Sequence, residues 1–125
     1  MTPNERAAQL EERLIAYAVR IVKLTEKFPR SYAGKYFGQQ LLRSGSAPAL
    51  LYGEARGAES NRDFRHKVSV GLKELRESHI NLRIVDRSNV IPTIRLDELI
   101  AETNELISIF VATVRTLDQR LNKTK

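Results

Sequence analysis

The chain has 125 residues, which suffices for a single domain, residues 1–125, that builds its core without disulfides or metals. Hydrophobic residues make up 42% and charged residues 29%, a balance typical of a folded globular protein. Cysteine is absent, which excludes disulfides and thiol catalysis, and the net charge of +6 favours a polyanion as partner. No apolar run approaches the roughly 20 residues that cross a bilayer, and no signal peptide is recognisable. We therefore expect a cytoplasmic protein without a membrane partner.

The first predicted helix runs from Thr2 to about Phe28. Thr2 can cap it, Pro3 fits the first helical position, and Glu5 can close a capping box. Pro29 ends the helix because it disfavours helical geometry at the residue before it. Within the helix, apolar residues alternate at spacings of 4 and 3, which predicts a buried seam of Leu10, Leu14, Tyr17, Ile21, Leu24 and Phe28.

The second predicted helix runs from Tyr32 to about Ala58 and contains Pro48. A proline inside a regular helix costs about 3 kcal/mol, but the heptad phase continues on both sides of Pro48. The sequence therefore predicts a kink within one helix rather than two helices. The small residues between Ser44 and Ala49 predict that a neighbouring helix approaches closely, without indicating which one.

The third predicted helix is capped by Ser60 and ends near Asn89, and the fourth covers the apolar pattern from Leu96 to Leu121. No segment alternates with a period of two, so no sheet is expected. Four helices of similar length with short connections predict an all-α, antiparallel up-down-up-down four-helix bundle. The expected core positions of the third helix are Phe64, Val68, Leu72, Leu75, His79 and Leu82.

Basic residues gather on one face of the third helix. At 100° per residue, they occupy an arc of about 80° beside the expected core face, and no acidic residue shares this arc. Like charges so placed repel each other by a few tenths of a kcal/mol per pair. An arrangement that costs stability suggests that the charges serve a function. Phosphate groups of a nucleic acid would neutralise them. The alternative is a solvated helix face. We call this set the basic stripe: Arg62, Arg65, Lys73, Arg76, Arg83 and Arg87.

Ile80 and Ile84 lie in or beside the same arc, and their exposure would indicate that the stripe borders a subunit interface. Arg43 and Glu54 lie about 20° apart around the second helix but about 16 Å apart along it, so they cannot pair with each other. We expect each to pair with another helix or another subunit. Two solvated charges are the alternative.

Catalytic patterns are weak. Asp63 and His66 have the spacing of a di-metal bundle motif, but they point away from the expected core and no second such pair exists. His79 is expected to be a hydrogen-bonded core residue. Ser44 and Ser46 lack the context of an activated nucleophile. We expect no enzyme activity, no catalytic residue, no metal site and no cofactor.

Several segments resemble one known protein family. Arg43-Ser44-Gly45 followed by Tyr52-Gly53-Glu54-Ala55 has a fairly specific spacing, and the similarity extends over about residues 10–120. In these segments the chain resembles the bacterial four helix bundle protein family, also called the 23S rRNA intervening-sequence protein family. Two positions depart from the family pattern. Leu51 stands where the family usually has asparagine, and Asn81 stands where it often has tryptophan. The other matching segments are Ala58-Glu59-Ser60, Asp63-Phe64, Lys67, Lys73-Glu74, Glu77, Leu82-Arg83 and Phe28-Pro29.

The resemblance implies a four-helix subunit that assembles into a ring, a homopentamer. It also implies likeness to the accessory variability determinant proteins of diversity-generating retroelements, which are basic rings that bind nucleic acid and a reverse transcriptase. The activity of the family itself is not established, so its name supplies no function.

Two functions remain open from the sequence. The first is a non-enzymatic ring that binds RNA or DNA through phosphate contacts of the basic stripe. The second is a protein-interaction adaptor that docks a partner such as a polymerase or reverse transcriptase. A metal-dependent nuclease is a weaker third hypothesis. The sequence does not distinguish RNA from DNA.

Overall fold

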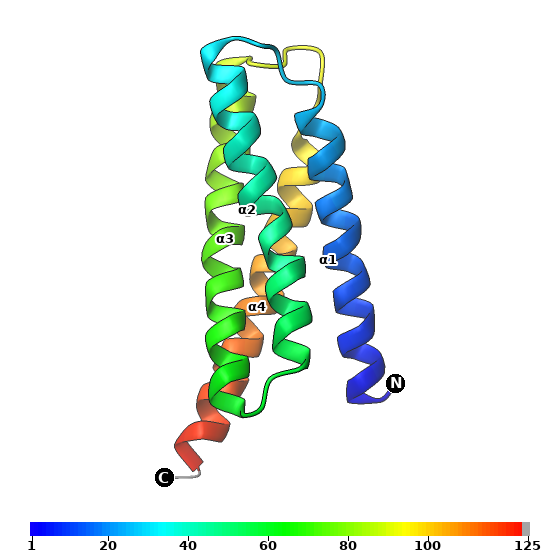
Figure 1. Ribbon diagram of the computed structural model, residues 1–125, viewed down its shortest axis with the longest axis vertical. Helices are drawn as coiled ribbons and strands as arrows, with labels where there is room; N and C mark the ends of the chain where they lie inside the picture. The colour runs from blue at the N-terminus through cyan, green and yellow to red at the C-terminus, as the bar shows by residue number, and fades with distance from the viewer. Residues whose placement is uncertain (124–125) are drawn as a thin grey trace.

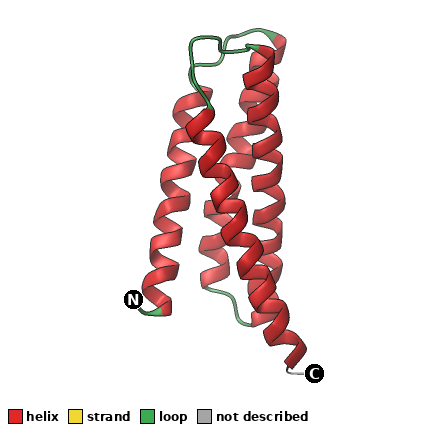
Figure 2. Cartoon of the chain, turned by 180° about the vertical axis from the view of Figure 1, so that it is seen from behind, coloured by secondary structure: helices red, strands yellow, loops and turns green. Residues whose placement is uncertain are grey.

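Four antiparallel helices form the molecule in the computed structural model, which describes residues 1–123 (Figure 1). They run up, down, up and down, so the predicted bundle is confirmed, and no strand occurs among the described residues. Figure 2 shows both long connections, α1–α2 and α3–α4, at the end opposite the two chain termini. No helix in the described part of the chain is long and apolar enough to span a bilayer. The helices are α1 (Pro3–Thr25), α2 (Tyr32–Arg56), α3 (Asn61–Ser88) and α4 (Asp97–Lys123).

Hydroxyl side chains fix the starts of the first three helices. The side-chain oxygens of Thr2, Ser31 and Ser60 each accept a hydrogen bond, 3.1 Å long, from the backbone N–H three residues later. These bonds satisfy donors that a helix start leaves free. The caps predicted at Thr2 and Ser60 are therefore confirmed. α1 ends at Thr25, one turn earlier than expected, because the chain tightens into i→i−3 hydrogen bonds at Lys27 and Phe28 before Pro29.

The small residues of α2 contact two neighbouring helices. A Cβ atom at Gly45 would lie 2.7 Å from Cγ1 of Ile21, so the glycine lets α1 approach α2. On the other side, the Ser78 hydroxyl of α3 donates a 2.8 Å hydrogen bond to the Ser44 hydroxyl. Helix α2 continues through Pro48 without a break, in agreement with the expectation of one helix. The predicted close approach thus involves both α1 and α3.

Side chains link α1 to α4 across the bundle. Tyr17 is buried, and its hydroxyl lies 2.6 Å from that of Thr103. Burial raises the pKa of Tyr17 to about 12, so its hydroxyl stays protonated. Nearer the solvent, the guanidinium of Arg13 donates hydrogen bonds to Glu102 (2.6 Å) and Glu105 (2.9 Å). The bond from Arg13 lowers the pKa of Glu102, which keeps this pair ionised at neutral pH.

Candidate nucleic-acid interface

The buried face of α3 is rotated from the expected one. Gly71 and Ser78 are buried, whereas Leu72 and His79 are only half-buried. The reason is steric: at Gly71 the ring of Phe110 from α4 occupies the space of a side chain, with Cε2 2.8 Å from a hypothetical Cβ. The expectation that His79 is a hydrogen-bonded core residue is wrong. It is half-buried and makes no side-chain hydrogen bond within residues 1–123.

This rotation places the basic stripe on the outer side of the bundle. At 100° per residue, the buried positions of α3 centre on the side opposite the arc that holds the stripe, instead of beside it. Four stripe residues are exposed and Arg83 is half-buried. Burial lowers the pKa of His79, and the positive charge of Arg83 lowers it further. Both effects favour a neutral imidazole beside Arg83. The exposed four are Arg62, Lys73, Arg76 and Arg87.

One stripe residue already has an anionic partner. The Nε of Arg65 donates a 2.5 Å hydrogen bond to Asp118 of α4. This bond raises the pKa of Arg65 and lowers that of Asp118. The remaining five residues of the basic stripe form no ion pair with any residue that the structure describes. Their positive charge is therefore available to an external anion.

Arg43 of α2 neutralises the acids nearest to the basic stripe. Its guanidinium lies 2.8 Å from a carboxylate oxygen of Glu74 and 2.7 Å from one of Glu77, both on α3. Of the two partners expected for Arg43, another helix or another subunit, the structure shows another helix of the same chain, and a place of Arg43 at a subunit interface stays a prediction. Because Arg43 holds both carboxylates, they do not neutralise Lys73 or Arg76 beside them. Glu54 is exposed and unpaired within residues 1–123, so its pairing with another subunit stays a prediction.

Besides single residues such as Leu50, exposed apolar side chains form two groups on the surface of the bundle. Ile80 and Ile84, which we expected near a subunit interface, are 49% and 42% exposed on α3. The second group was missed in the sequence, although Ile15, Val19 and Val22 repeat at helical spacing on α1. Leu42 of α2 is also exposed and lies beside the end of α1, sharing a surface hollow with Thr25 and Phe28. We call Ile15, Val19, Val22 and Leu42 the α1–α2 apolar patch.

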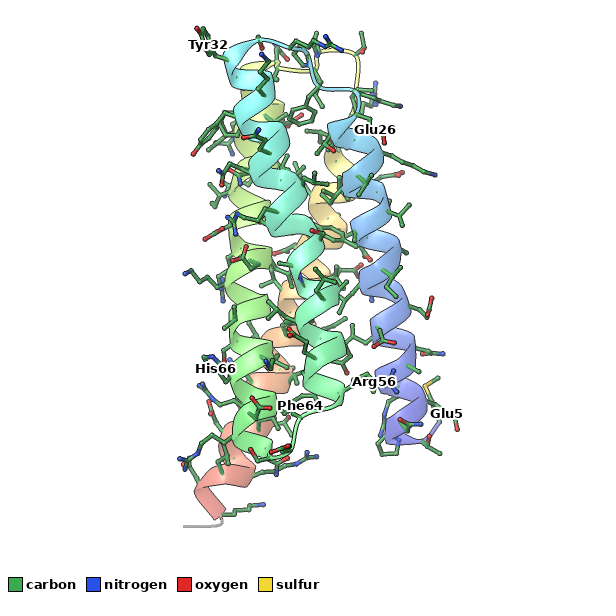
Figure 3. The ribbon with its side chains drawn as sticks, in the orientation of Figure 1. Glu5, Glu26, Tyr32, Arg56, Phe64 and His66 are labelled. Atoms are coloured by element: carbon green, nitrogen blue, oxygen red, sulfur yellow. The ribbon has the colours of Figure 1, made fainter. Side chains whose placement is uncertain are left out.

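Metal-ligand side chains do not cluster in the described structure. Asp63 is half-buried at the start of α3, and His66 points outward from the same helix (Figure 3). Within residues 1–123, no three histidine, aspartate or glutamate side chains are close enough to hold a metal ion. The residues that stand out chemically are therefore the unpaired cations of α3.

These features define a class of protein, an all-α four-helix bundle that exposes a row of unpaired cations on one helix. The model of the 23S rRNA-intervening sequence protein family matches residues 8–112, and the chain belongs to this family. A solved structure from Bacteroides thetaiotaomicron, a protein of unknown function from the S23 ribosomal protein family, is similar, with a TM-score of 0.77. The two chains are 25% identical over 84% of this chain and 97% of the other. No curated protein matches this chain.

Proposed function

We propose that the protein binds nucleic acid through phosphate contacts of the basic stripe and performs no catalysis. One observation carries the proposal. Five of the six stripe residues have no ionic partner within residues 1–123, and all five lie on one outward face of the single helix α3. Unpaired arginines and lysines are the side chains that hold phosphate groups. The net charge of +6 draws a polyanion toward this surface.

Binding through phosphates predicts a steep dependence on salt. If the five unpaired stripe residues each contact one phosphate, log K should fall against log salt concentration with a slope of about −3 to −5. Fluorescence anisotropy with a labelled oligonucleotide between low and high salt measures this slope. The affinity should depend little on sequence, because phosphates are identical along a strand. A slope near zero would contradict the proposal.

We further propose that the subunit assembles as a homo-oligomeric ring. The α1–α2 apolar patch supports this, since a water-exposed apolar face on neighbouring helices favours burial against another protein surface. Multi-angle light scattering should give a mass that is a multiple of the 14.3 kDa subunit, with five subunits as the expected number. Val19→Glu, which puts a charge in the patch, should reduce this mass. If the parent chain and the Val19→Glu variant were both monomers, the ring would be refuted. An adaptor that uses the patch to bind another protein would then be favoured.

A further inference from the structure

One face of α2 carries two tyrosines on the outer side of the bundle. Tyr32, Tyr36 and Arg43 lie within an arc of about 40° around α2 at 100° per residue. Arg43 reaches Glu74 and Glu77 on α3, so this face borders the outer side of α3. Because α2 and α3 are antiparallel, Tyr36, two turns before Arg43, lies level with the turn of α3 that carries Arg83. The tyrosines therefore lie on the outer side of α2, at the level of the C-terminal part of the basic stripe.

Both rings are exposed to solvent. Tyr32 is 97% exposed and points away from the bundle at the end where the α1–α2 connection lies (Figure 3). Tyr36 is 57% exposed, and its ring packs edge-on against Phe37 with the ring centres 5.1 Å apart. Neither hydroxyl makes a hydrogen bond with a described residue. Two flat apolar surfaces are thus presented to solvent at the end of the bundle that also carries Arg83 and Arg87.

A groove runs along the outer side of α3 and reaches α2 at Gln40 and Arg43. It has a volume of about 650 Å³ and includes Gln40 of α2, one turn from Tyr36. Its wall contains two cations of the stripe, Lys73 and Arg76, together with the apolar side chains of Leu72 and Ile80. Gln40 and Asn81 add side-chain amides, which can donate and accept hydrogen bonds at the edges of nucleobases. Glu77 also lines the groove, but its carboxylate is held by Arg43.

We infer that this surface binds single-stranded nucleic acid in preference to a duplex, with bases stacked on Tyr32 and Tyr36. The inference rests on the proposed phosphate contacts and adds the form of the ligand. A duplex buries the faces of its bases, so it offers phosphates to the arginines but no ring for the tyrosines. A single strand offers both, and proteins that bind it combine a cationic groove with aromatic side chains. The groove lined by Gln40 and Lys73 offers an unstacked base apolar side chains and amides.

The experiment compares four probes of equal length at one salt concentration. They are a single-stranded DNA, a single-stranded RNA and the two corresponding duplexes, each labelled for fluorescence anisotropy. We expect at least about tenfold tighter binding of the single strands. The Tyr32→Ala, Tyr36→Ala double variant should lose about ten- to hundredfold in single-strand affinity and leave duplex affinity unchanged. The comparison of the two single strands shows whether the ribose 2′-hydroxyl contributes.

The matched control is the Tyr32→Phe, Tyr36→Phe variant, which keeps the rings and removes the hydroxyls. It should bind single strands within about twofold of the parent chain, since stacking uses the ring face. Equal binding of single strands and duplexes, with the alanine variant unaffected, would overturn the inference and leave phosphate binding intact. Failure of every probe to bind would refute the proposed function as well. An alanine variant with altered oligomeric mass and unchanged single-strand affinity would also overturn the inference, because it would assign the tyrosines to a subunit contact.

Discussion

Replacing Arg76 and Arg83 together with glutamate is expected to weaken nucleic-acid binding by more than about 100-fold. Each replacement would remove one of the proposed phosphate contacts and add a charge that repels phosphate. Arg76 lines the groove on the outer side of α3, and Arg83 lies two turns further along the same arc. Neither forms an ion pair within residues 1–123. The folded state therefore loses no salt bridge, and the effect on binding can be measured by anisotropy on folded protein.

A matched variant separates local contact from overall charge. Arg6→Glu with Lys23→Glu lowers the net charge of +6 by the same amount, since each reversal removes two charges. Both residues are exposed on α1, a different helix from the one that carries the basic stripe. We expect this variant to lose much less affinity than the Arg76 and Arg83 variant. Equal losses in the two variants would mean that net charge alone attracts the nucleic acid and that the basic stripe is not the site.

The Gly45→Ala variant should be destabilised by about 1–3 kcal/mol, although alanine favours helices more than glycine does. The added methyl group would lie 2.7 and 2.8 Å from two side-chain carbons of Ile21, which is fully buried in α1. A β-branched side chain in a helix has little freedom to rotate away, so α1 and α2 must separate. Urea unfolding followed by circular dichroism measures the change.

Gly53→Ala is the control for this substitution, because it makes the same change in the same helix. A Cβ atom at Gly53 would meet only the Glu11 Oε1 atom, at 3.7 Å, which is ordinary contact. The variant should gain about 0.5–1 kcal/mol from helix propensity. If Gly45→Ala were stabilised as much as Gly53→Ala, the close approach of α1 and α2 at Gly45 would not hold in solution.

The fold could be predicted from sequence because its signals are local. The caps at Thr2 and Ser60, the stop at Pro29 and the alternating apolar spacing depend on residues within a few turns of each other. The family resemblance was equally local, and the matched region, residues 8–112, agrees with the expected extent. Even the uninterrupted α2 followed from the phase of the apolar residues on either side of Pro48.

The site was less predictable because it depends on contacts between helices. A pattern of large apolar residues selected Leu72 and His79 for the core, whereas Gly71 and Ser78 are buried since small residues let neighbouring helices approach. The same limit applies to charge. The arc of the basic stripe follows from one helix, but the pairing of Arg65 with Asp118 depends on where α4 lies. The sequence thus located the cations and not their partners.

The distribution of ion pairs makes the effects of ionic strength on folding and binding separable. The bridges made by Arg13, Arg43 and Arg56 are partly exposed, and each such pair contributes at most about 1 kcal/mol, a contribution that added electrolyte reduces. The contacts among buried apolar side chains do not depend on that screening. Concentrated electrolyte should therefore displace a polyanion from α3 while the bundle remains intact, and elution with salt would recover folded protein from an immobilised oligonucleotide.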